Sequence, residues 1–163
     1  MVIKIIAEGL LLGWLLVAFC AVGIRKGAVN MAFLYHKDVQ NKSVKSGLIT
    51  REKIRRNGLL FKGICIPIYF AFILISAYAV NGARGFWPGF WQMFAILSIV
   101  NLIDRLLIDE LWVGHTKTWD IPDTEDMKPY ITRKDKLGKW LMGTAGFALI
   151  SAVLSGIMVL VLR

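Results

Sequence analysis

The sequence predicts an all-α integral membrane protein with four transmembrane helices in an antiparallel bundle. The 163 residues are 56% hydrophobic, with a mean hydropathy of +0.59, whereas soluble domains are about 45–50% apolar. The apolar residues gather in four runs, and about 20 such residues can cross the ~30 Å hydrocarbon core as a helix. We therefore expect one membrane domain, residues 1–163, with spans at about 2–24, 63–80, 88–111 and 140–162.

The distribution of positive charge predicts the orientation. The formal net charge is +9, and residues 25–62 hold ten Lys or Arg against two acidic residues. Because cytoplasmic loops are enriched in Lys and Arg, we expect loops 25–62 and 112–139 in the cytoplasm. Both termini then lie on the outer side of a plasma (inner) membrane. Topology explains the basic block, so we expect no nucleic acid partner, and we expect residues 51–62 to contact anionic lipid headgroups.

Two patterns of small residues indicate close helix packing. Gly9 and Gly13 have the GxxxG spacing that lets a second helix approach closely. They could pack inside the protomer or form a homo-oligomer. The last span carries a second stripe with the same two uses, and its members are four residues apart: Thr144, Ala148, Ala152 and Gly156.

The first loop is expected to carry a short amphipathic helix at the membrane interface. Apolar residues recur there at helical intervals, namely Met31, Leu34, Tyr35 and Val39. Thr50 is a good N-cap for a helix leading into the second span. Thr132 and Asp135 have the spacing of a cap for the last helix.

The third span ends in a concentration of polar and charged residues. At a rise of 1.5 Å per residue, Asp104 and Arg105 lie about 24 Å into the membrane, and Asp109 and Glu110 reach the headgroups. A charge at such depth costs ~2.5 kcal/mol or more, so it should face protein, a partner or water. We expect Arg105 to pair with Asp109 at i, i+4, with Asn101 on the same face. Asp104 is expected about 100° away on a second face.

These residues are the candidates for function. Six are candidate ligand contacts: Asn101, Asp104, Arg105, Asp109, Glu110 and His115. Four are candidate acid–base groups, because carboxylates and imidazoles can exchange protons in a catalytic site: His36, His115, Asp109 and Glu110.

Metal, cofactor and nucleophile chemistry receive no support from motifs. There is no HExxH or paired-histidine spacing, no GxSxG and no glycine-rich phosphate loop, so we expect no metal and no cofactor. Cys20 and Cys65 lie inside apolar runs without a CxxC pattern, which argues against a disulfide or redox site.

Three functions remain open. The leading hypothesis is binding or transport of a small polar or amphipathic ligand through the charged cluster at the cytoplasmic end of the third helix. The alternative is a membrane-embedded enzyme that acts on a lipid-like substrate at the cytoplasmic leaflet. The third is a non-catalytic accessory or scaffold subunit, in which Arg105 and Asp109 form a structural pair.

Overall fold

The structure is a computed structural model that describes residues 1–162; Arg163 lies outside the described residues. The described chain is helical, without strands, and four helices are long and apolar enough to span a membrane. The first is α1, Val2–Ile24. The others are α3 (Arg51–Leu74) with the π-helix η2 (Ile75–Val80), α4 (Phe86–Ile103) with the π-helix η3 (Asp104–Val113), and α5 (Arg133–Val161). The predicted all-helical class, with four helices long and apolar enough to span a membrane, is confirmed.

Two helices begin where the capping residues predict. The Thr50 hydroxyl accepts a hydrogen bond from the Lys53 backbone N–H at 3.2 Å. Thr132 and Asp135 form a reciprocal capping box at the start of α5. A capped end satisfies backbone N–H groups that lack helical partners. Capping therefore allows α3 and α5 to begin well before their apolar segments. Both helices therefore carry a polar turn or more toward the loops.

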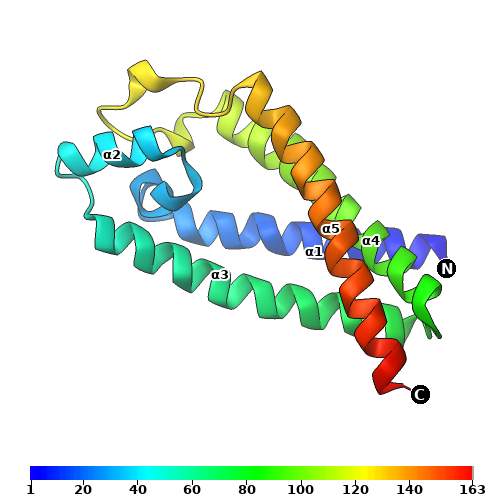
Figure 1. Cartoon of the computed structure of the whole chain (residues 1–163). Coiled ribbons are helices and arrows are strands. Elements are labelled where there is room, and N and C mark those ends of the chain that lie inside the picture. Colours follow the sequence, from blue (N-terminus) through cyan, green and yellow to red (C-terminus); the bar gives the residue numbers. More distant parts are fainter. Residues whose placement is uncertain (163) are drawn as a thin grey trace.

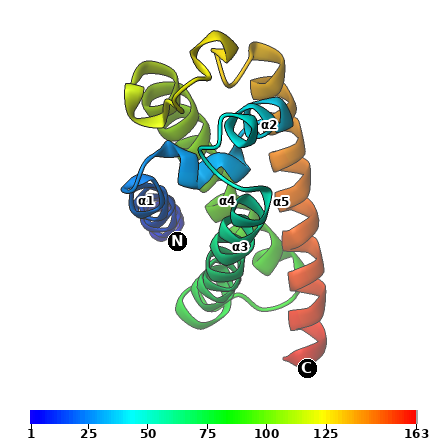
Figure 2. The ribbon, with the colours of Figure 1, turned by 90° about the vertical axis from the view of Figure 1, so that its left-hand side faces the viewer.

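Helix α4 is the central element, because α1 packs along one side of it and α5 along another (Figures 1 and 2). The glycine pair of α1 makes the first contact possible. A Cβ on Gly9 would stand 2.7 Å from Ile99 Cβ, and one on Gly13 would stand 2.2 Å from Ile103 Cδ1. Of the two uses expected for this pair, the structure therefore shows packing inside the protomer.

The packed face of α5 lies one residue away from the predicted stripe. Ser151 and Ser155 are fully buried, and a Cβ on Gly143 would stand 3.2 Å from Asn101 Oδ1 of α4. The predicted stripe lies beside this face and is exposed or half-buried, from Thr144 to Gly156. Its use by a second copy of the chain stays a prediction.

Helix α3 is held mainly at its two ends. Near the loops, Gly58 lies against Phe33, and the Phe33 and Phe61 rings are 5.4 Å apart. At the other end, the Tyr78 hydroxyl of η2 donates to Ser155 Oγ at 3.4 Å. This arrangement leaves room between α3 and α4 near the middle of the molecule.

The two long loops fold together at one end of the molecule, opposite the N-terminus and the end of α5 (Figure 1). They contain four short helices: η1 (Ala28–Leu34), α2 (Lys37–Lys45), η4 (Lys117–Trp119) and η5 (Glu125–Met127). Their buried side chains form a core that is separate from the core between the spans.

The structure differs from the single amphipathic helix expected in the first loop. The chain is extended at Tyr35, so the segment is a 3-10 helix followed by the α-helix α2. Met31 and Val39 are buried in the loop core with Trp119 and Ile121. Leu34, a third member of the stripe, is exposed. The second loop covers the buried members, a contact between distant segments that helical spacing alone does not reveal.

Candidate ligand-binding site

The predicted charged cluster forms around Arg105, at the start of the π-helix η3. The guanidinium makes ion pairs with Asp104 and Asp109, and its Nε donates to Asn101 Oδ1 at 3.4 Å. The Arg105 side chain is only 15% exposed. Because a buried charge needs a partner, these contacts explain how a guanidinium is accommodated near the end of an apolar span.

A cation from α5 completes the cluster. Lys139 Nζ lies 3.2 Å from Asp109 Oδ2, so two carboxylates and two cations balance one another. Lys139 lies one helical turn before Gly143, the residue whose missing side chain leaves room for Asn101. The close packing of α5 on α4 thus brings Lys139 to Asp109.

The predicted pairing of Arg105 with Asp109, and the position of Asn101 beside them, are confirmed. Asp104, which helical spacing places about 100° away from Arg105, also forms an ion pair with the Arg105 guanidinium. The helix changes to π geometry at Asp104. The long Arg side chain also reaches back to its chain neighbour. π-Helical segments are often found at functional sites.

The cluster lies at the wall of a cavity of about 410 Å³ whose lining combines apolar side chains with several charged ones. Helices α1, η3 and α5 and both loops contribute to its lining, which includes Cys20, Tyr35, His36, Asp104, Arg105, Asp109, Trp119, Tyr130 and Lys139. Cavities of roughly 300–1,000 Å³ with a few placed polar groups are typical of small-molecule sites.

Tyr35 and Tyr130 are two of the residues that the loops contribute to this lining. The Tyr35 hydroxyl donates to the backbone carbonyl of Trp119, and the two tyrosine rings meet edge to face at 5.1 Å. Burial raises the pKa of Tyr35 well above its ordinary value. The side chain is therefore a neutral donor at physiological pH, and it ties the first loop to the second.

A second cavity, of about 240 Å³, adjoins the first on the side toward the middle of the spans. Asp104 and Leu16 line both cavities. The rest of the second lining comes from α3, α4 and α5 and is mostly apolar: Cys65, Ile66, Tyr69, Phe70, Leu97, Val100, Asn101, Phe147 and Ile150. A charged chamber and an apolar chamber therefore meet at Asp104.

The structure brings together some of the predicted site residues and not others. Asn101, Asp104, Arg105 and Asp109 line one or both cavities, as does His36. The two remaining candidates lie outside both linings. Glu110 pairs with Lys136, and His115 Nδ1 lies 2.7 Å from the Glu110 backbone carbonyl.

His36 is positioned beside a carboxylate. Its Nε2 lies 3.3 Å from Asp135 Oδ2, the same carboxylate that caps α5 through Thr132. Among residues 1–162, no three His, Cys, Asp or Glu side chains lie together in a way that could hold a metal ion.

Several lining residues could not be recognised from sequence motifs. Cys20, Tyr69 and Trp119 look like ordinary apolar or aromatic positions in the sequence. Lys139 has a usable signal, since it precedes the last apolar span by one residue on a helix with small residues facing α4.

Comparisons of the chain with family models, with curated proteins and with solved structures give no match.

Proposed function

We propose that this protein binds, and in a membrane transports, a small amphipathic ligand. The observation that carries the proposal is the meeting of the two cavities at Asp104. A polar head group can lie in the charged chamber while an apolar tail lies between α3 and α4. Binding of such a ligand leaves no unpaired protein charge at bilayer depth, because Asp104 and Arg105 already compensate one another.

The cluster constrains the chemistry of the head group. Asp104 and Asp109 accept hydrogen bonds, while Arg105 and Lys139 donate them. A head group with both donors and acceptors, such as a zwitterion or an amine beside a hydroxyl, matches this set. A purely anionic or purely cationic head group would have to compete with an existing ion pair.

We also propose how the four helices are oriented in the membrane. We place the four helices as an antiparallel bundle in the plasma (inner) membrane, with both termini outside and loops 25–62 and 112–139 in the cytoplasm. The basic first loop supports this orientation. In this orientation the charged chamber opens at the cytoplasmic leaflet. A homo-oligomer through the stripe Thr144 to Gly156 would leave both chambers intact, because none of the stripe residues lines them.

The test compares two carboxylates on the same helix. Asp104→Asn removes the charge shared by both chambers, whereas Glu110→Gln removes a carboxylate outside them. Compounds retained by each purified protein are identified by mass spectrometry after extraction, and the retained compound is then offered to proteoliposomes. We expect Asp104→Asn to lose retention and uptake while Glu110→Gln keeps both. Equal behaviour of the two variants would contradict the proposal and favour an accessory or scaffold role.

One observation favours the enzyme as a second candidate function. His36 lines the charged chamber and is paired with Asp135. In this arrangement a carboxylate can orient an imidazole as a general base. On this alternative, the retained compound is converted to a product, and His36→Gln abolishes conversion while retention persists. Retention without conversion by the wild-type protein would exclude it.

A further inference from the structure

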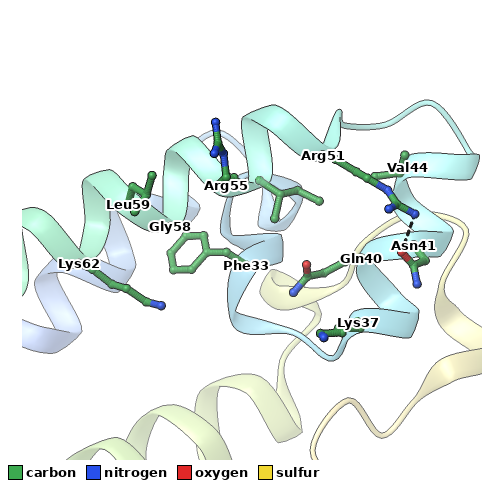
Figure 3. A pocket seen from close by; sticks show the side chains of 11 residues that line it. Phe33, Lys37, Gln40, Asn41, Val44, Arg51, Arg55, Gly58, Leu59 and Lys62 are labelled. Atoms are coloured by element: carbon green, nitrogen blue, oxygen red, sulfur yellow. Dashed lines mark hydrogen bonds between the residues drawn. The ribbon is translucent and has the colours of Figure 1, made fainter.

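A third cavity, of about 510 Å³, lies on the other side of the first loop. It is a groove between α2 and the first half of α3, with Phe33 of η1 between them (Figure 3). Its polar lining contains four cations and two amides: Lys37, Arg51, Arg55, Lys62, Gln40 and Asn41. It shares no lining residue with the two chambers described above.

The positive charge of this groove is not compensated by carboxylates. None of its four cations forms an ion pair with an acidic side chain anywhere in residues 1–162. The acidic residues nearest in sequence, Asp38 and Glu52, do not line the groove. The neighbouring Lys42, in contrast, is paired with Asp126. The groove therefore holds an excess of positive charge that an anion could neutralise.

The geometry places these cations on opposite sides of one space. Figure 3 shows Lys37 of α2 and Lys62 of α3 extending toward the region beside the Phe33 ring, while Arg55 extends away from that ring. Arg51 reaches across from α3 to α2, where its Nη2 donates to Asn41 Oδ1 at 3.2 Å. That bond fixes one end of the groove.

The width of the groove follows from a glycine. A Cβ on Gly58 would stand 3.3 Å from the Cβ and Cγ of Phe33, so the absence of a side chain lets η1 lie directly against α3. The Asn57 side chain strengthens the same contact by donating to the Asn30 carbonyl at 2.9 Å. The groove is thus held by fixed packing on one wall.

We propose that this groove is a binding site for a phosphate-bearing anion, with Lys37 and Lys62 as the phosphate contacts and Arg51 adding positive charge at the end of the groove near Asn41. Phosphate oxygens accept strong charge-assisted hydrogen bonds from Arg and Lys. Lys62 directly precedes the apolar part of the second span, which puts the site at the level of lipid headgroups. The phosphate can therefore come from a phospholipid or from a soluble phosphate ester.

Two triple variants of equal charge test the proposal. The groove variant carries Lys37→Gln, Arg51→Gln and Lys62→Gln. The control carries one change on α2 and two on α3 at cations that do not line the groove: Lys45→Gln, Lys53→Gln and Arg56→Gln. The full-length proteins, in a neutral detergent, are titrated with phosphatidic acid, with phosphatidylcholine as a second lipid and glycerol 3-phosphate as the soluble probe.

We expect the groove variant to bind phosphatidic acid about tenfold or more weakly than wild type, and the control to stay within about threefold, since exposed charges away from the ligand contribute little. Binding of phosphatidic acid alone would identify a lipid as the source of the phosphate, and equal binding of glycerol 3-phosphate would identify a soluble ester. Equal loss in both variants, or no phosphate binding by wild type, would overturn the proposal. Circular dichroism of both variants shows whether they retain the wild-type helix content. If the groove variant does not fold, the single variant Lys62→Gln is compared with Arg56→Gln, and equal binding would overturn the proposal.

Discussion

Arg105 forms an ion pair with Asp104, the residue directly before it, at the point where the charged chamber meets the apolar one. The same guanidinium binds Asp109 one turn later. One cation therefore holds two carboxylates whose side chains are mostly buried.

Replacing Arg105 by an uncharged residue should lower the free energy of unfolding. Arg105→Met leaves Asp104 without a partner and Asp109 with Lys139 alone. Breaking a buried pair on one side destabilises a protein by about 3–5 kcal/mol, and we expect the free energy of unfolding in detergent to fall by that order. Thermal unfolding followed by circular dichroism measures the change.

The matched control is Arg84→Met, at an exposed arginine whose guanidinium donates only to the Ala83 carbonyl. Its effect should stay below about 1 kcal/mol, as for other surface charges. If the two variants lost the same free energy of unfolding, the ion pairs of Arg105 would contribute no more to stability than a surface contact does.

The contact between α1 and α4 leads to a prediction about glycine. Gly9→Ala places a methyl group 2.7 Å from Ile99 Cβ, an atom that cannot move without its helix. Overpacking costs about 1–3 kcal/mol, so this variant should unfold more readily than wild type. Gly146→Ala is the control, because nothing lies within 4 Å of the added carbon.

The free energy of unfolding of Gly146→Ala should equal that of wild type or exceed it by up to about 1 kcal/mol, since alanine is a better helix former than glycine. Thermal unfolding of both variants in one detergent gives the comparison. If Gly9→Ala were as stable as Gly146→Ala, α1 could not be packed against α4 as the structure has it.

Much of the fold follows from the sequence, because apolar length and capping act locally. Four runs of lipid-compatible length predict four helices, and Thr50 and Thr132 mark two helix starts. The π-helix at Asp104 could not be predicted in this way, since it alters the register of a segment whose residues would also suit an α-helix. Asp104 is the first residue of this segment and forms an ion pair with Arg105.

The site was predictable only where its members share one helix. Asn101, Arg105 and Asp109 recur every four residues, and their proximity follows from helical spacing. Tyr35 meets Trp119 through a contact between segments 84 residues apart. Such pairings depend on how the two loops pack, which no local pattern encodes.

The tie between the loops can be tested at Tyr35. Tyr35→Phe removes the donor to the Trp119 carbonyl, and the loss of one hydrogen bond costs about 0.5–1.5 kcal/mol. We expect faster amide hydrogen exchange in residues 117–121 with the spans unchanged. Tyr69→Phe is the control, because its hydroxyl donates to Leu12, inside the spans. Unchanged exchange in the second loop of Tyr35→Phe would show that the ring alone holds the loops together.

The contact between α2 and η5 should depend on pH only in acid. The hydrogen bond from Lys42 holds the pKa of Asp126 below its ordinary value. The pair therefore stabilises the contact above the ordinary carboxyl range of about pH 4, and this contribution is lost as the pH falls through the lower value of the folded protein. NMR shifts of residues 125–127 should stay constant from neutral pH down to that range and then change.

The control for this titration is Lys42→Met. Without the ammonium group, Asp126 should titrate at a higher pH than in wild type. Identical titration of Asp126 in both proteins would show that the ion pair does not form in solution.

Native mass spectrometry of the protein released from a mild detergent, with two neighbouring variants of α5, tests whether the two chambers hold a ligand. Ile150→Trp fills the apolar chamber, whereas Leu149→Trp adds the same side chain at a residue that is 66% exposed and outside it. We expect one retained amphipathic molecule per protomer in wild type and Leu149→Trp, and none in Ile150→Trp. A wild-type protein without a bound molecule, or equal retention by both variants, would contradict the proposed function.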